Sequence, residues 1–213
     1  ARAIAGVQAA AEISQILGHL NHSERYQAAA DEVRQAMLFH LYDEKLGRFL
    51  KRIKRRNGQT IERDNTPDAS IMAIWKLGVL EPNDPRVVST MEQLHNALTL
   101  KVGIGGMARY TNDHYHAATE LSVDIPGNPW ILTTLWEAQW HIAKAKTVED
   151  LAPARKALDW TVKYASPTGI LAEQLHPLTG AHLSVAPLTW SHATFVETVL
   201  LFAEREKELK GEK

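Results

Sequence analysis

The sequence predicts an all-α protein. Apolar residues recur at helical spacing along most of the 213 residues, and Gly or Pro separates one helical segment from the next. No strand-like runs alternate with helices as a parallel βαβ sheet would require. A chain of this length can bury a sizeable core. We therefore expect residues 1–213 to belong to a single helical domain.

The expected elements follow in order along the chain. Gly18 is suited to end the first helix, and Ser23 can cap the second. Asn57-Gly58 favours a tight type I′ turn and predicts a small β-hairpin near residues 48–62. The predicted helices cover residues 3–18, 23–41, 67–77, 85–98, 129–145, 149–165 and 189–208.

The sequence also indicates the nature of three segments outside the helix interiors. Residues 99–128 form a long loop, and loops of that length in compact domains are usually functional. Residues 204–213 alternate acidic and basic side chains, which predicts a solvated, frayed tail. The basic run from Lys51 to Arg56 is typical of a solvated hairpin edge, with anion binding as the alternative.

Composition excludes several classes of function. The 24 Lys and Arg nearly balance the 25 Asp and Glu, for a net charge of -1, which argues against a nucleic-acid partner. There is no Cys, so thiol chemistry is excluded, and no apolar run is long enough for a membrane span.

The first residues lack an initiator Met and a signal pattern, so we expect the interior of a longer chain. Localisation stays unknown, with a prokaryotic cytoplasm favoured over secretion.

Residues 169–193 hold the types of side chain from which carbohydrate sites are built. Glu173 follows Gly169 and stands beside the amide of Gln174, and Trp190 opens an apolar helix a few residues later. A carboxylate can move a proton, an amide can bind sugar hydroxyls, and an indole can cover the apolar face of a sugar. A lone Glu in a loop is ordinarily a solvated, inert residue, so the neighbours decide the interpretation.

A second candidate cluster lies upstream, in residues 105–136. Arg109 and Tyr110 precede Asp113, and Gly127-Asn-Pro-Trp130 starts a predicted helix. Arg offers a planar fork of donors that suits adjacent hydroxyls. The alternative is a structural ion pair between Arg109 and Asp113 within the loop.

The two motifs, in this order, resemble those of the glucoamylases, the glycoside hydrolases of family 15. The resemblance runs from about residue 1 to residue 205 and implies that the chain is the C-terminal half of an (α/α)6 toroid of antiparallel helix pairs. It makes Glu173 the general base and Arg109 a ligand of the nonreducing-end glucose. The other substrate-binding residues that it implies are Tyr110, Asp113, Trp130, Gln174 and Trp190. Both motifs can serve one pocket only if the loops 103–130 and 166–190 lie close together, as we expect.

The general acid of this family has no match in residues 1–30, where Glu12 and Glu24 lie without a neighbouring Trp. We therefore expect an N-terminal half of the same enzyme as partner and an α-glucan oligosaccharide as substrate. The expected activity is that of an inverting, exo-acting α-glucosidase. The alternatives are a trehalase- or dextran-directed hydrolase, a non-catalytic regulatory or carbohydrate-binding relative, and a helical interaction scaffold.

The remaining candidates receive structural interpretations. The pairs His114 with His116 and His176 with His182 do not have metal-ligand spacing on one helical face, so we expect neither a metal nor another cofactor. His192 is assigned to packing or hydrogen bonding. Asp68 either caps the third helix or lies at the rim of the pocket. The Trp residues assigned to the core are Trp75, Trp136, Trp140 and Trp160.

Overall fold

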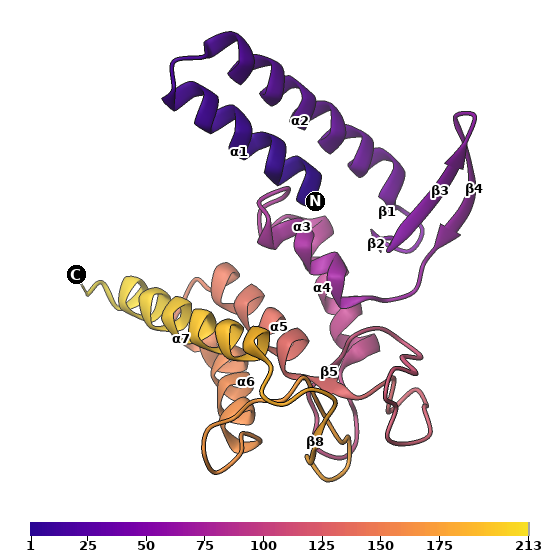
Figure 1. Cartoon of the computed structure of the whole chain (residues 1–213), viewed down its shortest axis with the longest axis vertical. Helices are drawn as coiled ribbons and strands as arrows, with labels where there is room; N and C mark the ends of the chain where they lie inside the picture. The colour runs from indigo at the N-terminus through magenta and orange to yellow at the C-terminus, as the bar shows by residue number, and fades with distance from the viewer. Residues whose placement is uncertain (213) are drawn as a thin grey trace. The chain divides into compact units, whose positions relative to one another are not determined.

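The computed structural model describes residues 1–212, which fold as two compact units. The first unit comprises Ala1–Asn65 and Ser70–Thr90, and the second comprises Thr66–Ala69 and Met91–Lys213. Helices dominate both units and small antiparallel sheets accompany them (Figure 1). The prediction of a mostly helical fold with a small hairpin is therefore confirmed.

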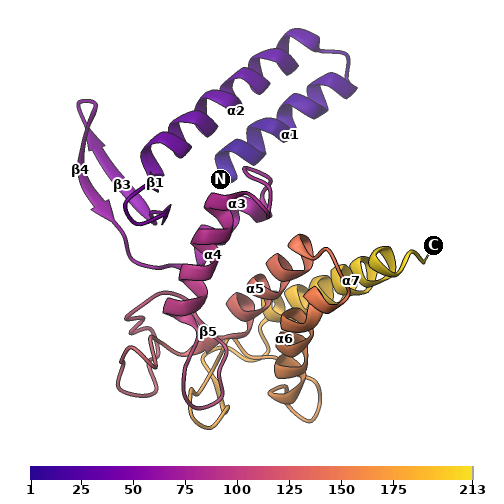
Figure 2. The same cartoon turned by 180° about the vertical axis from the view of Figure 1, so that it is seen from behind.

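The first unit begins with a helical hairpin. Helices α1 (Arg2–Ile16) and α2 (Leu20–Leu41) lie side by side and antiparallel in both Figure 1 and Figure 2. The chain reverses at Gly18, whose φ of 76° is a conformation that only glycine adopts without strain. Because this turn is so short, α2 begins after His19, and the prediction that Ser23 caps it is wrong.

Two short antiparallel pairs follow. β1 (Tyr42–Asp43) pairs with β2 (Arg48–Phe49), and β3 (Arg52–Arg56) pairs with β4 (Gln59–Asp64). The turn between β3 and β4 has positive φ at both central residues, 48° at Asn57 and 77° at Gly58, as a type I′ turn requires. Most side chains of β3 and β4 are exposed, so the basic run forms a solvated edge as predicted.

The third predicted helix is shorter than its periodicity suggests. A 3₁₀ turn (Ala69–Met72) leads into the single-turn α3 (Ala73–Lys76), and α4 (Pro85–Leu98) has the predicted bounds. Pro67 and Asp68 are not helical, because Asp68 forms an antiparallel bridge with Tyr110 and the peptide N–H of Ala69 donates to the carbonyl of Arg109. Tertiary pairing therefore overrides helix formation at this point.

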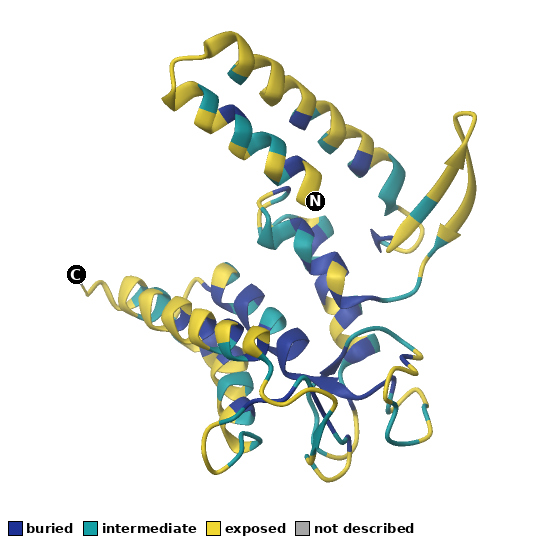
Figure 3. Ribbon diagram, in the orientation of Figure 1, coloured by how far each residue is buried: buried dark blue, intermediate teal, exposed yellow. Residues whose placement is uncertain are grey.

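The second unit is built around α5 (Ile131–Lys144), which is buried along most of its length and is coloured dark blue over much of it in Figure 3. The 3₁₀ turn Glu149–Leu151, α6 (Ala152–Lys163) and α7 (Thr189–Lys210) complete the helices of this unit. One apolar cluster of this unit joins Ala138, Ile142 and Phe202, and another joins Ile131, Leu135 and Leu175. The core of the unit thus lies between α5 and its neighbours α6 and α7.

A four-stranded antiparallel sheet connects the loops at one end of α5. Its order is β5 (Met107–Ala108), β6 (Pro129–Trp130), β7 (Gln174–Leu175) and β8 (His182–Leu183). The peptide N–H of Ile104 also donates to the carbonyl of Pro177. The two motif-bearing loops, predicted to meet, therefore do lie together.

The predicted frayed tail is wrong for the part that α7 covers. Helix α7 continues to Lys210 and ends at Gly211, which has a φ of 69°. Phe202 is buried, and Arg205 donates to the carbonyl of Ala145, so packing and this anchor hold the charged segment helical. Among residues 1–212, no helix combines the length and the apolar composition that a bilayer span requires.

The tryptophans assigned to the core differ in their burial. Trp140 is fully buried, as predicted. The other three are only partly buried, so their assignment to the core holds only in part: Trp75, Trp136 and Trp160. Trp160 uses its indole N–H to bind the carbonyl of Ile104 at 2.8 Å, which places this side chain at the sheet end of the unit.

We predict that the bond between His95 of α4 and Glu137 of α5 makes stability depend on pH. His95 Nδ1 lies 2.6 Å from Glu137 Oε1, and this hydrogen bond raises the pKa of His95. Its stabilisation is therefore fully present below the pKa of the unfolded state and is lost as pH rises through the folded-state pKa. His95→Gln should lower the urea midpoint more at pH 5 than at pH 9. His114→Gln, at an exposed histidine of the same unit, should show no such difference, and an equal loss at both pH values for His95→Gln would contradict the prediction.

Candidate active site

The backbone around Glu173 is fixed from several directions. The peptide N–H of Glu173 donates to the carbonyl of Val185, and β7 begins at the next residue. The first turn of α7 holds the preceding residues, because Ser191 Oγ donates to the carbonyl of Ala172 and His192 Nε2 accepts from the N–H of Leu171. The predicted hydrogen-bonding role of His192 is thus confirmed.

The side chain of Glu173 uses one of its two oxygens within the protein. Its Oε2 accepts hydrogen bonds from Gln174 Nε2 at 3.2 Å and from the hydroxyl of Ser184 at 2.5 Å. Among the described residues, no partner is found for Oε1. Because the residue is only half-buried, this second oxygen is available to a ligand or a water molecule.

Gln174 is fully buried and connects Glu173 to the upstream motif. Its Oε1 accepts a hydrogen bond of 2.8 Å from Nδ2 of Asn128, which is also buried. Asn128 in turn donates to the carbonyl of His116 and accepts from the N–H of Ala118. A chain of amides therefore links the loop before α5 to the carboxylate before α7.

Arg109 forms the second part of the site. Its Nε and Nη2 donate to the two oxygens of Asp113, each at 2.9 Å, and Nη2 also lies 3.3 Å from the hydroxyl of Tyr110. Asp113 is almost completely buried. Burial lowers the pKa of Arg109, but the hydrogen bonds and attraction of Asp113 outweigh it and leave that pKa raised. The guanidinium is thus a fixed cation, and no described residue uses its Nη1.

Aromatic rings surround this guanidinium. Its Cζ lies 4.7 Å from the ring centre of Trp130, 4.8 Å from that of Tyr110 and 5.1 Å from that of Tyr115. Trp130 is buried and pairs with Gln174 across β6 and β7. The sheet therefore brings the Arg109 cluster and the Glu173 segment together.

Trp190 lies apart from the aromatic group around Arg109. Its side chain is half exposed, and its ring meets that of Trp136 at a centroid distance of 5.7 Å. Asp68 is buried beside Tyr110 at the Arg109 cluster. Among residues 1–212, no group of three or more His, Cys, Asp or Glu residues has a geometry that could hold a metal ion.

Two residues that received no role from the sequence, Asn128 and Ser184, contact the predicted residues. Asn128 stands inside the Gly-Asn-Pro-Trp motif, so its position could have marked it. Ser184 has a φ of 60°, which is unusual for a residue with a side chain, and nothing in the local sequence indicates this. Only the fold brings Ser184 to Glu173.

Comparison with known families identifies the chain. The sequence model of the family described as Glycosyl hydrolases family 15 matches residues 1–151. The chain belongs to this family. An uncharacterized glycosyl hydrolase of Methanocaldococcus jannaschii is 32% identical over 168 residues, which are 74% of this chain and 24% of the relative.

Two enzymes with named activities are similar as well. A glucoamylase of a Clostridium species is 30% identical over 144 residues, covering 65% of this chain and 20% of that enzyme. A trehalase of Mycobacterium tuberculosis is 24% identical over 203 residues, covering 94% of this chain and 27% of that enzyme. The chain thus spans between 20% and 27% of the length of these relatives.

The fold also matches a solved structure of the family. A bacterial glucoamylase, solved in complex with acarbose, superposes with a TM-score of 0.79 and 23% identity over 96% of this chain and 33% of that chain. This likeness confirms the expectation that the residues fold as part of a glucoamylase-type (α/α)6 toroid.

We predict that Asn128→Ala destabilises the second unit by about 1–3 kcal/mol, because the buried amide of Gln174 loses its partner. Urea unfolding followed by circular dichroism measures the change. Asn96→Ala, at an exposed position of α4 in the same unit, should stay within about 0.5 kcal/mol of the wild type. Equal stability of the two variants would show that the amide chain does not hold the loops together.

Proposed function

We propose that these residues form part of the active site of an inverting, exo-acting α-glucosidase that removes glucose from the nonreducing ends of α-glucans. The observation that supports the proposal best is the set of hydrogen bonds around Glu173. Its backbone is fixed, its Oε2 is occupied by Gln174 and Ser184, and its Oε1 is left for water. A general base needs this combination of fixed orientation and one accessible oxygen.

In the proposed reaction a water molecule bound at Glu173 Oε1 attacks the anomeric carbon and gives its proton to the carboxylate. The glycosidic bond breaks, and a second carboxyl group protonates the leaving oxygen. The two carboxyl groups of inverting enzymes lie about 6.5–9.5 Å apart, which leaves room for the water. We assign the second carboxyl group to a part of the enzyme outside residues 1–213.

Arg109 is proposed to hold the terminal sugar. Two of its nitrogens are bound to Asp113 and Tyr110, so Nη1 remains as a donor for a sugar hydroxyl. Trp130 and Tyr110 supply apolar surface beside it, and Gln174 orients Glu173. Trp190, half exposed and paired with Trp136, is proposed to bind a sugar unit further from the point of cleavage.

The chain is proposed to be the C-terminal half of the catalytic domain, covered by the N-terminal half of the same enzyme. Large apolar side chains of α7 are exposed in this structure: Val196, Val199 and Leu200. Monomeric proteins rarely expose large contiguous apolar surfaces. The second candidate function is hydrolysis of trehalose, because a trehalase is among the similar proteins.

We predict that Glu173→Gln in the complete enzyme lowers kcat on maltooligosaccharides by about a hundredfold or more, since a general base contributes about 10²–10⁴. KM should change little, because the amide keeps the shape of the side chain. The wild type should release β-glucose first, as followed by NMR.

Glu120→Gln, at an exposed glutamate of the same unit, should keep normal turnover. Near-normal turnover of Glu173→Gln, or α-glucose as first product, would contradict the assignment. Faster cleavage of trehalose than of maltose would favour the second candidate function.

We also predict that Arg109→Lys raises KM by about tenfold or more, because Lys has neither the forked contact with Asp113 nor a planar group to stack on the rings. Steady-state kinetics on maltose and longer oligosaccharides measure the change. Arg155→Lys serves as the control, since Arg155 pairs with Glu206 on the surface of the same unit. An unchanged KM with normal folding would mean that Arg109 only stabilises the loop.

A further inference from the structure

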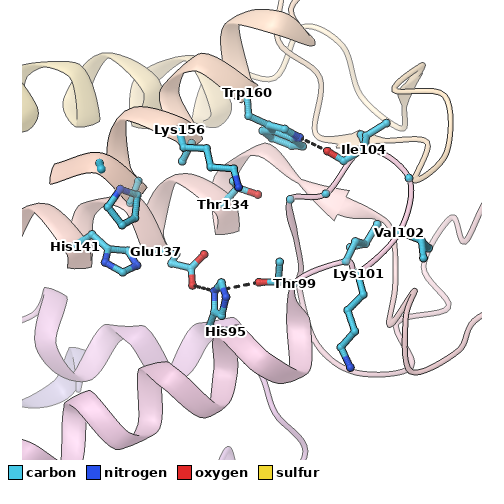
Figure 4. Close-up of a pocket in the computed structure, with 18 residues that line it drawn as sticks. His95, Thr99, Lys101, Val102, Ile104, Thr134, Glu137, His141, Lys156 and Trp160 are labelled. Atoms are coloured by element: carbon cyan, nitrogen blue, oxygen red, sulfur yellow. Dashed lines mark hydrogen bonds and ion pairs between the residues drawn. The ribbon is translucent and has the colours of Figure 1, made fainter. Parts of the chain in front are cut away.

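The second unit has a cavity that lies outside the residues assigned to hydrolysis. This groove has a volume of about 730 Å³ and lies against α4, α5, α6 and the loop 100–106 (Figure 4). Small-molecule sites in proteins typically have about 300–1,000 Å³. None of Glu173, Gln174, Arg109 and Asp113 lines it, so the groove is separate from the proposed active site.

The charges that line the groove do not cancel. Glu137 is the acidic side chain among the described lining residues, and its Oε1 is already hydrogen-bonded to His95 Nδ1 at 2.6 Å. Lys156 and Lys101 also line the groove, and neither has an acidic partner among the described residues. Figure 4 shows Lys156 reaching from α6 toward Thr134 of α5. A net positive charge therefore remains at a mostly apolar surface.

The other groups of the groove define the shape of a ligand rather than its charge. Burial lowers the pKa of His141, which disfavours the charged form of its ring. The Thr134 hydroxyl accepts a hydrogen bond from the N–H of Met107 and donates one to the carbonyl of Trp130. Ala157 and Trp160 form an apolar wall on α6, and the indole N–H of Trp160 is already bound to Ile104. The free polar groups are thus mainly cationic.

We propose that this groove binds a small organic anion. Its carboxylate or phosphate group lies against Lys156 and its apolar body against Ala157 and Trp160. An anion is favoured over a neutral polyol because the carboxylate of the groove is already paired, while the ammonium of Lys156 is not. Charge-assisted hydrogen bonds to such a group are stronger than neutral ones.

Calorimetry on the complete enzyme tests the proposal with benzoate, phenyl phosphate and neutral benzyl alcohol as probes. We expect at least one of the two anions to bind, and the tighter one identifies a carboxylate or a phosphate as the recognised group. Benzyl alcohol should bind much more weakly. Lys156→Gln should weaken anion binding by about tenfold or more, since a hydrogen bond to a charged group is lost. Lys163→Gln, on the same helix but outside the groove, should leave the affinity unchanged.

Two further variants test the apolar wall and the charge of the groove separately. Ala157→Trp should weaken anion binding by filling the space at the apolar wall, and Glu137→Gln should strengthen or preserve it because a negative charge is removed. Turnover of oligosaccharides should be unchanged in Lys156→Gln, which keeps this test independent of the proposed hydrolysis. Absence of anion binding at millimolar concentration would overturn the proposal. So would binding that Lys156→Gln leaves intact, binding that Glu137→Gln abolishes, or equal affinity for benzyl alcohol.

Discussion

The hydrogen bond between Asn128 and Gln174 is the interaction on which the candidate site depends. Both amides are buried, so neither can exchange its partner for bulk water, and an unpaired amide at this depth would be costly. The bond joins the loop before α5 to the loop before α7. Since Gln174 also contacts Glu173, the position of that carboxylate depends on a loop 46 positions upstream of Gln174.

Helix α5 provides the platform for both loops. The hydroxyl of Thr133 donates to the carbonyl of Met107, and the N–H of Met107 donates to the hydroxyl of Thr134. The first turn of α5 thus holds the strand that leads into Arg109. Trp130, just before this turn, pairs with Gln174. Because α5 is buried along most of its length, it forms a rigid base from which the Arg109 cluster and the Glu173 segment are both positioned.

The parts of the fold that local chemistry determines could be predicted from sequence. The turn at Asn57 and Gly58 follows from the need for positive φ, and the bounds of α4 follow from Pro85 and its apolar periodicity. The extended conformation at Asp68 could not be predicted, because it depends on pairing with the distant Tyr110.

The same distinction holds within the candidate site. Arg109 and Asp113 stand four residues apart in one loop, so their contact could be expected from the sequence. The contact of Ser184 with Glu173 cannot be expected from the sequence, because only the pairing of β7 with β8 carries Ser184 to Glu173. The buried bond between Asn128 and Gln174 likewise joins two loops that are adjacent only in the folded chain.

Helix α7 exposes apolar residues on one side, while hydrogen-bonded hydroxyl groups lie on its buried side. Its buried side includes Ser191, Thr194, Thr198 and Phe202, whereas Val196 and Leu200 are exposed. The buried hydroxyls of Ser191 and Thr198 are satisfied by the carbonyls of Ala172 and Thr194, and Thr198 also accepts from Gln139. Ser191 on this buried side also holds the loop of Glu173, because its hydroxyl donates to the carbonyl of Ala172.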